Sequence, residues 1–160
     1  DLNNDNLKEV VIMDYASNLI VANHNGQILP NWPKLLDLPQ GYEYNIPDVA
    51  PAIADIDGDG SNEIIIYSLG FSPECCNPGD SMTRVWVLNY DGTNVPGWPK
   101  DLYGFDSVLM SNIAVADLNN DNQLEIISRS YSGKLYVWNP DGTNSDLLIL
   151  SFRMSLMKLV

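Results

Sequence analysis

Residues 55–63, which read DIDGDGSNE, gather acidic side chains in one short stretch. Carboxylates occupy its first, third, fifth and ninth positions as Asp55, Asp57, Asp59 and Glu63, and glycines occupy the fourth and sixth. Alternate side chains of a tight loop can converge, and converging carboxylates repel one another unless a cation joins them. Oxygen ligands on a flexible loop suit Ca²⁺, whereas Mg²⁺ demands a stricter octahedral arrangement. The stretch therefore predicts a calcium-binding loop.

The same spacing occurs twice more, as DLNNDNLKE at residues 1–9 and DLNNDNQLE at residues 117–125. An EF-hand would need a bidentate glutamate at the twelfth position of each loop. The three copies have Ile66, Ile12 and Ser128 there, which excludes that motif. A solvated turn rich in Asp and Asn is the simpler alternative, and it explains one copy better than three copies in register.

Strand and turn signals surround each acidic stretch. The stretches begin at residues 1, 55 and 117, and each is followed by a β-branched run, a turn, a second apolar run and an Asn-Gly or Asp-Gly hairpin signal. PAIAD and IAVAD lead into the second and third stretches, and QILPNWPK at 27–34 matches TNVPGWPK at 93–100. Four strands repeated at this interval are the signature of a β-propeller blade.

We therefore predict an all-β fold made of about three four-stranded antiparallel blades, forming an open arc of a larger propeller. The expected boundaries within a single partial domain, residues 1–160, are 1–38 for blade 1, which lacks its first strand, 49–103 for blade 2 and 111–152 for blade 3. Residues 147–152 would supply a substitute fourth strand, and the tail at 153–160 matches nothing earlier. Because propellers use about 4 to 8 blades, we expect the chain to be a fragment whose remaining blades come from further sequence or from other copies.

The composition narrows the possible functions. A net charge of −13 disfavours nucleic acid and anionic membrane surfaces as partners and favours cations. The apolar runs are too short to insert in a membrane. His24 is the single histidine and falls in a hairpin turn, so the chain cannot assemble a Ser/His/Asp triad or a His-rich zinc site, and we expect no catalytic activity.

Two further features could contact ligands. The insertion GFSPECCNPGDSM at residues 70–82 is unique to blade 2 and is a candidate partner-contacting loop. Its Cys75 and Cys76 could form a vicinal disulfide in an oxidising compartment or remain two free thiols. The four tryptophans could stack on sugars, but their recurrence at strand positions favours packing between blades: Trp32, Trp86, Trp98 and Trp138.

The D-x-[DN]-x-D-x-x-x-E loop after an A-x-A-D strand, together with the DGTNVPGWPK ending, resembles the FG-GAP (VCBS-type, integrin-α-like) β-propeller repeats of secreted and cell-surface proteins. The resemblance covers residues 1 to about 144. It implies Ca²⁺ bound by the side chains at loop positions 1, 3, 5 and 9 and by the backbone carbonyl at position 7, in up to three sites. The implied ligands are Asp55, Asp57, Asp59, Ser61 and Glu63; Asp1, Asn3, Asp5, Leu7 and Glu9; and Asp117, Asn119, Asp121, Gln123 and Glu125. Asn6 and Asn122 depart from the family, which prefers glycine there.

Two classes of function follow from this resemblance. The first is a non-catalytic, calcium-binding segment of an extracellular or cell-surface protein that acts as an adhesion or ligand-recognition scaffold for a protein or carbohydrate. The alternative is the propeller portion of a secreted polysaccharide-acting enzyme of the lyase type. A lyase needs a base and cationic residues near the acidic sugar. The chain has eight Lys and Arg, with no apparent cluster, which favours the scaffold.

Overall fold

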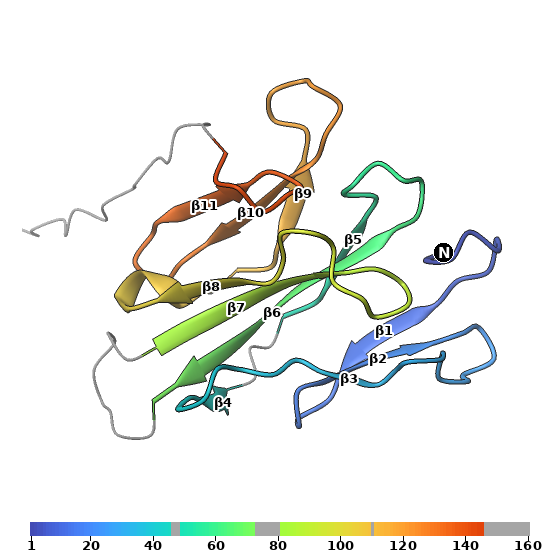
Figure 1. Ribbon diagram of the computed structural model, residues 1–160, viewed down its shortest axis with the longest axis horizontal. Coiled ribbons are helices and arrows are strands. Elements are labelled where there is room, and N and C mark those ends of the chain that lie inside the picture. The colour runs from blue at the N-terminus through green and yellow to red at the C-terminus, as the bar shows by residue number, and fades with distance from the viewer. Residues whose placement is uncertain (46–48, 73–80, 110, 146–160) are drawn as a thin grey trace, which may run out of the picture.

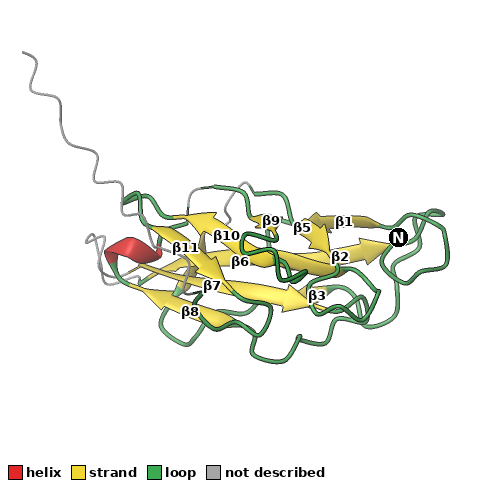
Figure 2. Ribbon diagram, turned by 90° about the horizontal axis from the view of Figure 1, so that it is seen from above, coloured by secondary structure: helices red, strands yellow, loops and turns green. Residues whose placement is uncertain are grey.

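The computed structural model describes residues 1–45, 49–72, 81–109 and 111–145 (Figure 1). Regular structure in these residues is β, apart from the 3₁₀ turn η2 at Phe105–Ser107, drawn red in Figure 2. No helix among them is long and apolar enough to cross a membrane. The predicted all-β fold is confirmed.

The strands form three antiparallel sheets that lie side by side in chain order (Figure 1). Sheet 1 has the order β1-β2-β3, with β1 Val10–Met13, β2 Asn18–Ala22 and β3 Lys34–Leu35. Sheet 2 contains β4 Glu43–Asn45, β5 Ala52–Ala54, β6 Glu63–Phe71, β7 Ser81–Leu88 and β8 Lys100–Tyr103. Sheet 3 has the order β11-β10-β9, with β9 Ala114–Ala116, β10 Glu125–Arg129 and β11 Leu135–Trp138. Each sheet corresponds to one predicted blade, and sheet 1 lacks the strand that β5 and β9 supply to the others.

Sheet 2 is longer than the repeat pattern predicts. Strands β6 and β7 continue into the expected loop at 70–82, where Gly70 pairs with Met82 and Phe71 with Ser81. The linker strand β4, which we did not predict, pairs with this extension through Glu43 and Phe71. The insertion therefore begins and ends as strand. Its backbone hydrogen bonds are satisfied there by β4, which pairs with the end of β6, and by β8, which pairs with the start of β7. Cys75, Cys76 and the predicted strand at 147–152 lie outside the described residues.

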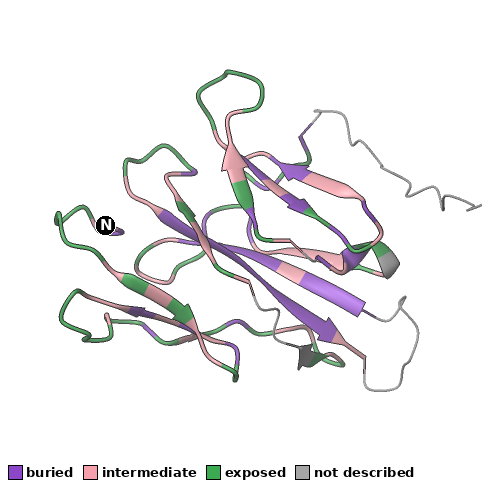
Figure 3. Ribbon diagram, turned by 180° about the vertical axis from the view of Figure 1, so that it is seen from behind, coloured by how far each residue is buried: buried purple, intermediate pink, exposed green. Residues whose placement is uncertain are grey.

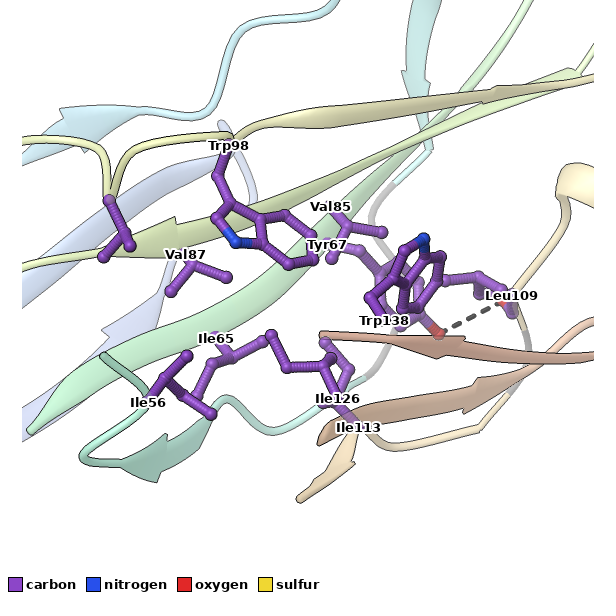
Figure 4. Close-up of a cluster of buried hydrophobic side chains, with 11 residues drawn as sticks. Ile56, Ile65, Tyr67, Val85, Val87, Trp98, Leu109, Ile113, Ile126 and Trp138 are labelled. Atoms are coloured by element: carbon purple, nitrogen blue, oxygen red, sulfur yellow. Dashed lines mark hydrogen bonds between the residues drawn. The ribbon is translucent and has the colours of Figure 1, made fainter. Parts of the chain in front are cut away.

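The core consists of two apolar clusters, one on each face of sheet 2. Alternate residues of a strand point to opposite faces, and β6 is apolar on both. Ile64 and Ile66 belong to the cluster shared with sheet 1, and Ile65 and Tyr67 belong to the cluster shared with sheet 3 (Figure 4). Every residue of β6 up to Gly70 is buried, as the purple central strands of Figure 3 show. Sheet 2 is thus stable because a blade covers each of its faces.

The tryptophans pack between blades, as predicted. Trp32 and Trp86 lie in the cluster between sheets 1 and 2, and Trp98 and Trp138 lie in the cluster between sheets 2 and 3. The rings of Trp98 and Trp138 meet edge to face with centroids 6.1 Å apart. Such aromatic pairs contribute about 0.5–1.5 kcal/mol beyond their buried area.

Hydrogen bonds from one blade to the next hairpin turn accompany this packing. The Trp32 indole Nε1 donates to the Tyr90 carbonyl at 2.9 Å. The Trp98 indole Nε1 donates to the Pro140 carbonyl at 2.8 Å. Tyr90 and Pro140 occupy the same position of their respective turns, so both interfaces use the same contact.

Close backbone approach at the second interface can be tested with a glycine pair. A Cβ on Gly97 would overlap the carbonyl oxygen of Asp141, whereas a Cβ on Gly41 would meet no described atom within 4 Å. Both glycines have φ above +90°, so alanine carries a left-handed backbone cost of about 1–2 kcal/mol at each. We expect Gly97→Ala to lose about 1–3 kcal/mol more than Gly41→Ala, because overpacking adds to that cost. Urea unfolding of the two variants measures the difference, and equal losses would contradict the interface.

Candidate metal centre

The three acidic stretches form loops along one edge of the molecule (Figure 1). We call residues 1–9, 55–63 and 117–125 acidic loops 1, 2 and 3. Loop 2 joins β5 to β6, loop 3 joins β9 to β10, and loop 1 precedes β1. Hairpins position loops 2 and 3 through the same pairing, in which the final glutamate faces an alanine: Glu63 pairs with Ala54 and Glu125 with Ala116.

The loops share one internal hydrogen-bond pattern. In loop 2 the Asp55 carboxylate accepts the Gly60 amide at 3.1 Å, and the Asp59 carboxylate accepts the Ser61 amide at 2.7 Å. The Asp57 carboxylate accepts the Asp59 amide at 3.2 Å. Loops 1 and 3 repeat these three bonds at the matching positions: Asn6 to Asp1, Leu7 to Asp5, Asp5 to Asn3, Asn122 to Asp117, Gln123 to Asp121 and Asp121 to Asn119. Backbone amides therefore hold the side chains at positions 1, 3 and 5.

Positions 4 and 6 of every loop adopt left-handed backbone. The residues are glycine in loop 2 and asparagine in loops 1 and 3: Gly58, Gly60, Asn4, Asn6, Asn120 and Asn122, with φ between 60° and 90°. Glycine and asparagine are the residues that tolerate this conformation best. Asn6 and Asn122 therefore preserve the loop path although they replace glycine.

A buried glutamate closes each loop. The side chain of Glu63 is 1% exposed, and one of its carboxylate oxygens accepts the Ile56 amide at 2.8 Å. Glu9 and Glu125 accept the Leu2 and Leu118 amides at 2.7 and 2.8 Å in the same way. Burial, together with the charges of Asp57 and Asp59 and against the lowering effect of the Ile56 amide, raises the pKa of Glu63 to about 7.

Loop 2 brings three carboxylates within range of a common ion. One oxygen each from Asp55, Asp57 and Glu63 lie within 4.8 Å of one another. Two oxygens bound to one Ca²⁺ at 2.3–2.6 Å are separated by at most about 5 Å. The donor set of loop 2 thus fits calcium, with Asp55 and Glu63 at the base and Asp57 exposed.

The remaining predicted ligands are placed less closely. Asp59 lies outside the group that Asp55, Asp57 and Glu63 form, and the acids of loops 1 and 3 do not form such a group among the described residues. In loops 1 and 3 an asparagine replaces one acid, and its amide donates to the carboxylate at position 5, from Asn3 to Asp5 at 3.1 Å and from Asn119 to Asp121 at 2.9 Å.

Protein cations do not neutralise loop 2. Within the described residues, the lysine and arginine ion pairs join Arg84 to Asp101 at 2.6 Å and to Asp37 at 4.0 Å, away from the loops. The Arg84 guanidinium, hydrogen-bonded to Asp101, holds the pKa of that carboxyl below its usual value. The negative charge of loop 2 is therefore available to an external cation.

Loops 1 and 2 are joined by two asparagines that sequence reasoning missed. Asn4 Nδ2 donates to the Gly60 carbonyl at 2.8 Å, and Asn62 Nδ2 donates to the Asp1 carbonyl at 2.9 Å. At the matching positions of the next pair of loops, Gly58 and Leu124 carry no side-chain donor. Asparagine is common in turns for local reasons, so no sequence signal indicated this contact between blades.

A cavity of about 690 Å³ lies between loop 3 and the last hairpin of sheet 2. Its lining is acidic and amide-rich on the loop side and includes prolines from two hairpin turns. The residues are Asp57, Val95, Pro96, Asn119, Asp121, Gln123, Glu125, Asn139, Pro140, Asp141 and Ser145. An ion held in loop 3 would face this cavity.

Comparison with known proteins agrees with these observations. No curated protein matches the chain significantly. Residues 1–66 match the family model described as FG-GAP-like repeat. The matched region contains acidic loop 1, sheet 1, strands β4 and β5, acidic loop 2 and the start of β6. Loop 3, outside the match, repeats the same hydrogen bonds. Residues 1–66 are therefore an FG-GAP-type repeat region.

Proposed function

We propose that the chain is a calcium-binding β-propeller segment of an extracellular or cell-surface protein, where it acts as a scaffold for adhesion or ligand recognition. The observation that carries the proposal is the convergence of Asp55, Asp57 and Glu63 within 4.8 Å. Asp59 and the carbonyl of Ser61 would complete this site. Loops 1 and 3, which share its hydrogen bonds, would hold weaker sites because each has one acid fewer.

The chemistry of loop 2 supports calcium as the cation. A bound ion would offset the repulsion between its carboxylates and the cost of burying the ionised Glu63 side chain. Calcium sites of extracellular modules work at about 10⁻⁴–10⁻³ M, and a partly exposed site such as loop 2 would be filled at such concentrations. These points support an extracellular setting.

The scaffold role is favoured over the lyase role by the placement of cations. Arg84 is engaged by Asp101 through two hydrogen bonds of 2.6 and 2.8 Å, and the Lys34 amine donates to the Gly92 carbonyl between blades. Both groups therefore serve structure, whereas a lyase would need such cations at an acidic sugar. The cavity beside loop 3 is the place where a ligand could approach bound calcium.

Calcium should raise the melting temperature. A ligand that binds the folded state at 100 times its dissociation constant stabilises it by about 2.7 kcal/mol, which corresponds to roughly 5–10 °C for a chain of this size. Differential scanning fluorimetry with and without calcium measures the shift. Asp55→Asn should remove most of it, and Asp37→Asn, which removes an exposed acid outside the loops, should leave it intact. Identical melts with and without calcium would contradict the proposal.

The same melts should depend on pH through Glu63. Its folded-state pKa of about 7 lies above the ordinary value of 4.5, so its contribution to metal-free stability is present at low pH and is lost as pH rises toward 7. Calcium must displace the proton at pH 5.5 but meets an ionised group at pH 8. The stabilisation by calcium should therefore be larger at pH 8, and Glu63→Gln should reduce that increase. A calcium effect that is independent of pH would exclude Glu63 as a ligand.

Calcium binding in loop 2 should respond to loop 1 and not to loop 3. Asn4 and Asn62 connect loops 1 and 2, so Asp5→Asn should weaken calcium binding at loop 2 by about fivefold, the low end of coupling between sites. Asp121→Asn in loop 3 is the matched control. Amide shifts of Gly58 and Gly60 during a calcium titration report loop 2 specifically.

A second substitution isolates the asparagine contact. Asn4 and Asn120 have φ of 60° and 62°, and glycine adopts this backbone in both loops. Asn4→Gly should abolish the effect of Asp5→Asn on loop 2, whereas Asn120→Gly should not. Equal effects from loops 1 and 3 would contradict the coupling.

A further inference from the structure

The three hairpin turns that follow the third strand of each blade have the same structure. Their residues are 23–27, 89–93 and 139–143. In each turn the backbone amide of the first residue donates to the carbonyl of the fifth, and its carbonyl accepts from the amide of a glycine at the fourth: Asn23, Gly26 and Gln27; Asn89, Gly92 and Thr93; Asn139, Gly142 and Thr143. The glycine φ values are 77°, 83° and 75°. Three copies of one backbone conformation present their carbonyls in the same way.

Two of these turns accept hydrogen bonds from side chains of the preceding blade. Trp32 Nε1 and Lys34 Nζ donate to the carbonyls of Tyr90 and Gly92, and Trp98 Nε1 donates to the carbonyl of Pro140. The Trp32 ring lies 3.7 Å from the site of a Cβ on Gly92. Each donor belongs to a Trp-Pro-Lys sequence, at 32–34 and 98–100.

The turn of blade 1 is open. Its carbonyls from His24 and Gly26 match those of Tyr90 and Gly92, but a Cβ on Gly26 would meet none of the described atoms within 4 Å. Gly26 is exposed, whereas Gly142 is buried by blade 2. The carbonyl positions that accept from tryptophan and lysine in blade 2 thus face solvent in blade 1.

An apolar face of sheet 1 adjoins this open turn. Paired residues of an antiparallel sheet lie on the same face, and the register places Val10, Ile12, Ile28 and Leu35 on one face together. Their exposed fractions are 55, 52, 53 and 50%. The counterparts of Val10 and Ile12 in sheet 2 are Ile64 and Ile66, which are 0 and 1% exposed because blade 1 covers them.

We propose that this face of sheet 1 and the carbonyls of its turn form a docking surface for a further repeat blade that ends in Trp-Pro-Lys. The docked tryptophan donates to the His24 carbonyl, and the docked lysine donates to the Gly26 carbonyl. The interfaces between sheets 1 and 2 and between sheets 2 and 3 show the tryptophan contact twice in the same chain, and the first of them also shows the lysine contact. The exposed apolar face supplies the buried area that accompanies it.

The third blade of a second copy does not fit this surface. Residues 143–150 read TNSDLLIL where residues 93–100 read TNVPGWPK. Leu148 and Leu150 therefore stand at the positions of Trp98 and Lys100, and neither side chain can donate a hydrogen bond. The assigned occupant is therefore a repeat blade that has the Trp-Pro-Lys ending.

A tandem protein tests the proposal with the chain's own blade as the probe. Residues 55–116 are joined directly before Asp1, which keeps the repeat register because Asp117 and Asp1 are equivalent positions. Hydrogen exchange at residues 23–28 should slow by about tenfold or more, since docking closes the turn. A shorter extension, residues 111–116 alone, supplies the missing strand of blade 1 without the docking blade and should leave exchange at 23–28 unchanged.

Substitutions in the added copy test the contact itself. Trp98→Phe with Lys100→Met keeps apolar volume but removes both donors, and it should restore fast exchange at residues 23–28. Trp32→Phe removes the matching donor at the existing interface between blades 1 and 2. The increase in hydrogen exchange that it causes at residues 89–93 gives the size of the effect to expect. Unchanged exchange in the tandem protein, or equal protection by the substituted copy, would overturn the proposal.

A titration avoids any need for the added blade to fold. A peptide of residues 93–102, added at millimolar concentration to the isotopically labelled chain, should shift the amides of Gly26 and Gln27 and leave those of Gly92 and Thr93 in place. The Trp98→Phe peptide should cause no shift. If the unmodified peptide also causes none, or if the chain alone dimerises through residues 23–28, the surface does not have the assigned occupant.

Discussion

A glutamate carboxylate is buried at the base of each acidic loop, and the repeat is arranged around it. Glu63 and Glu125 are each 1% exposed. Each begins a central strand, pairs with an alanine of the preceding strand and accepts the amide at the second loop position. A buried carboxylate is costly unless it is paired, hydrogen-bonded or bound to a metal. One backbone amide partly satisfies it, and the cation that we propose, shared with the other loop acids, would satisfy its remaining oxygen acceptors.

The second constraint is that a blade has two apolar faces and covers neither by itself. Sheet 2 is buried on both sides because sheets 1 and 3 pack against it, with Ile64 facing one and Ile65 the other. The indole contacts of Trp32 and Trp98 fix the register of this packing at the hairpin turns. The acidic loops and the hairpin turns belong to the same repeat. Stacking the blades therefore also brings neighbouring acidic loops together, as the hydrogen bond between Asn4 and Gly60 shows.

Much of this fold could be predicted from the sequence, because repeats multiply weak local signals. The acidic spacing, the Asn-Gly and Asp-Gly turns and the Trp-Pro-Lys endings each recur, and the all-β fold, the separate blades and the tryptophan packing are confirmed. Strand β4 and the strand extensions at Gly70 and Phe71 were missed, since they depend on pairing between segments far apart in the chain and have no repeat equivalent. The contacts of Asn4 and Asn62 were missed for a similar reason: a turn asparagine looks the same whether it bonds locally or across blades.

Native mass spectrometry tests directly whether these loops bind calcium around their buried glutamates, as we propose. In millimolar calcium the chain should carry three calcium ions. Conversion of Glu9, Glu63 and Glu125 to glutamine should leave none, without changing the β-sheet content seen by circular dichroism. An unmodified chain that remains folded and carries no calcium under these conditions would contradict the account.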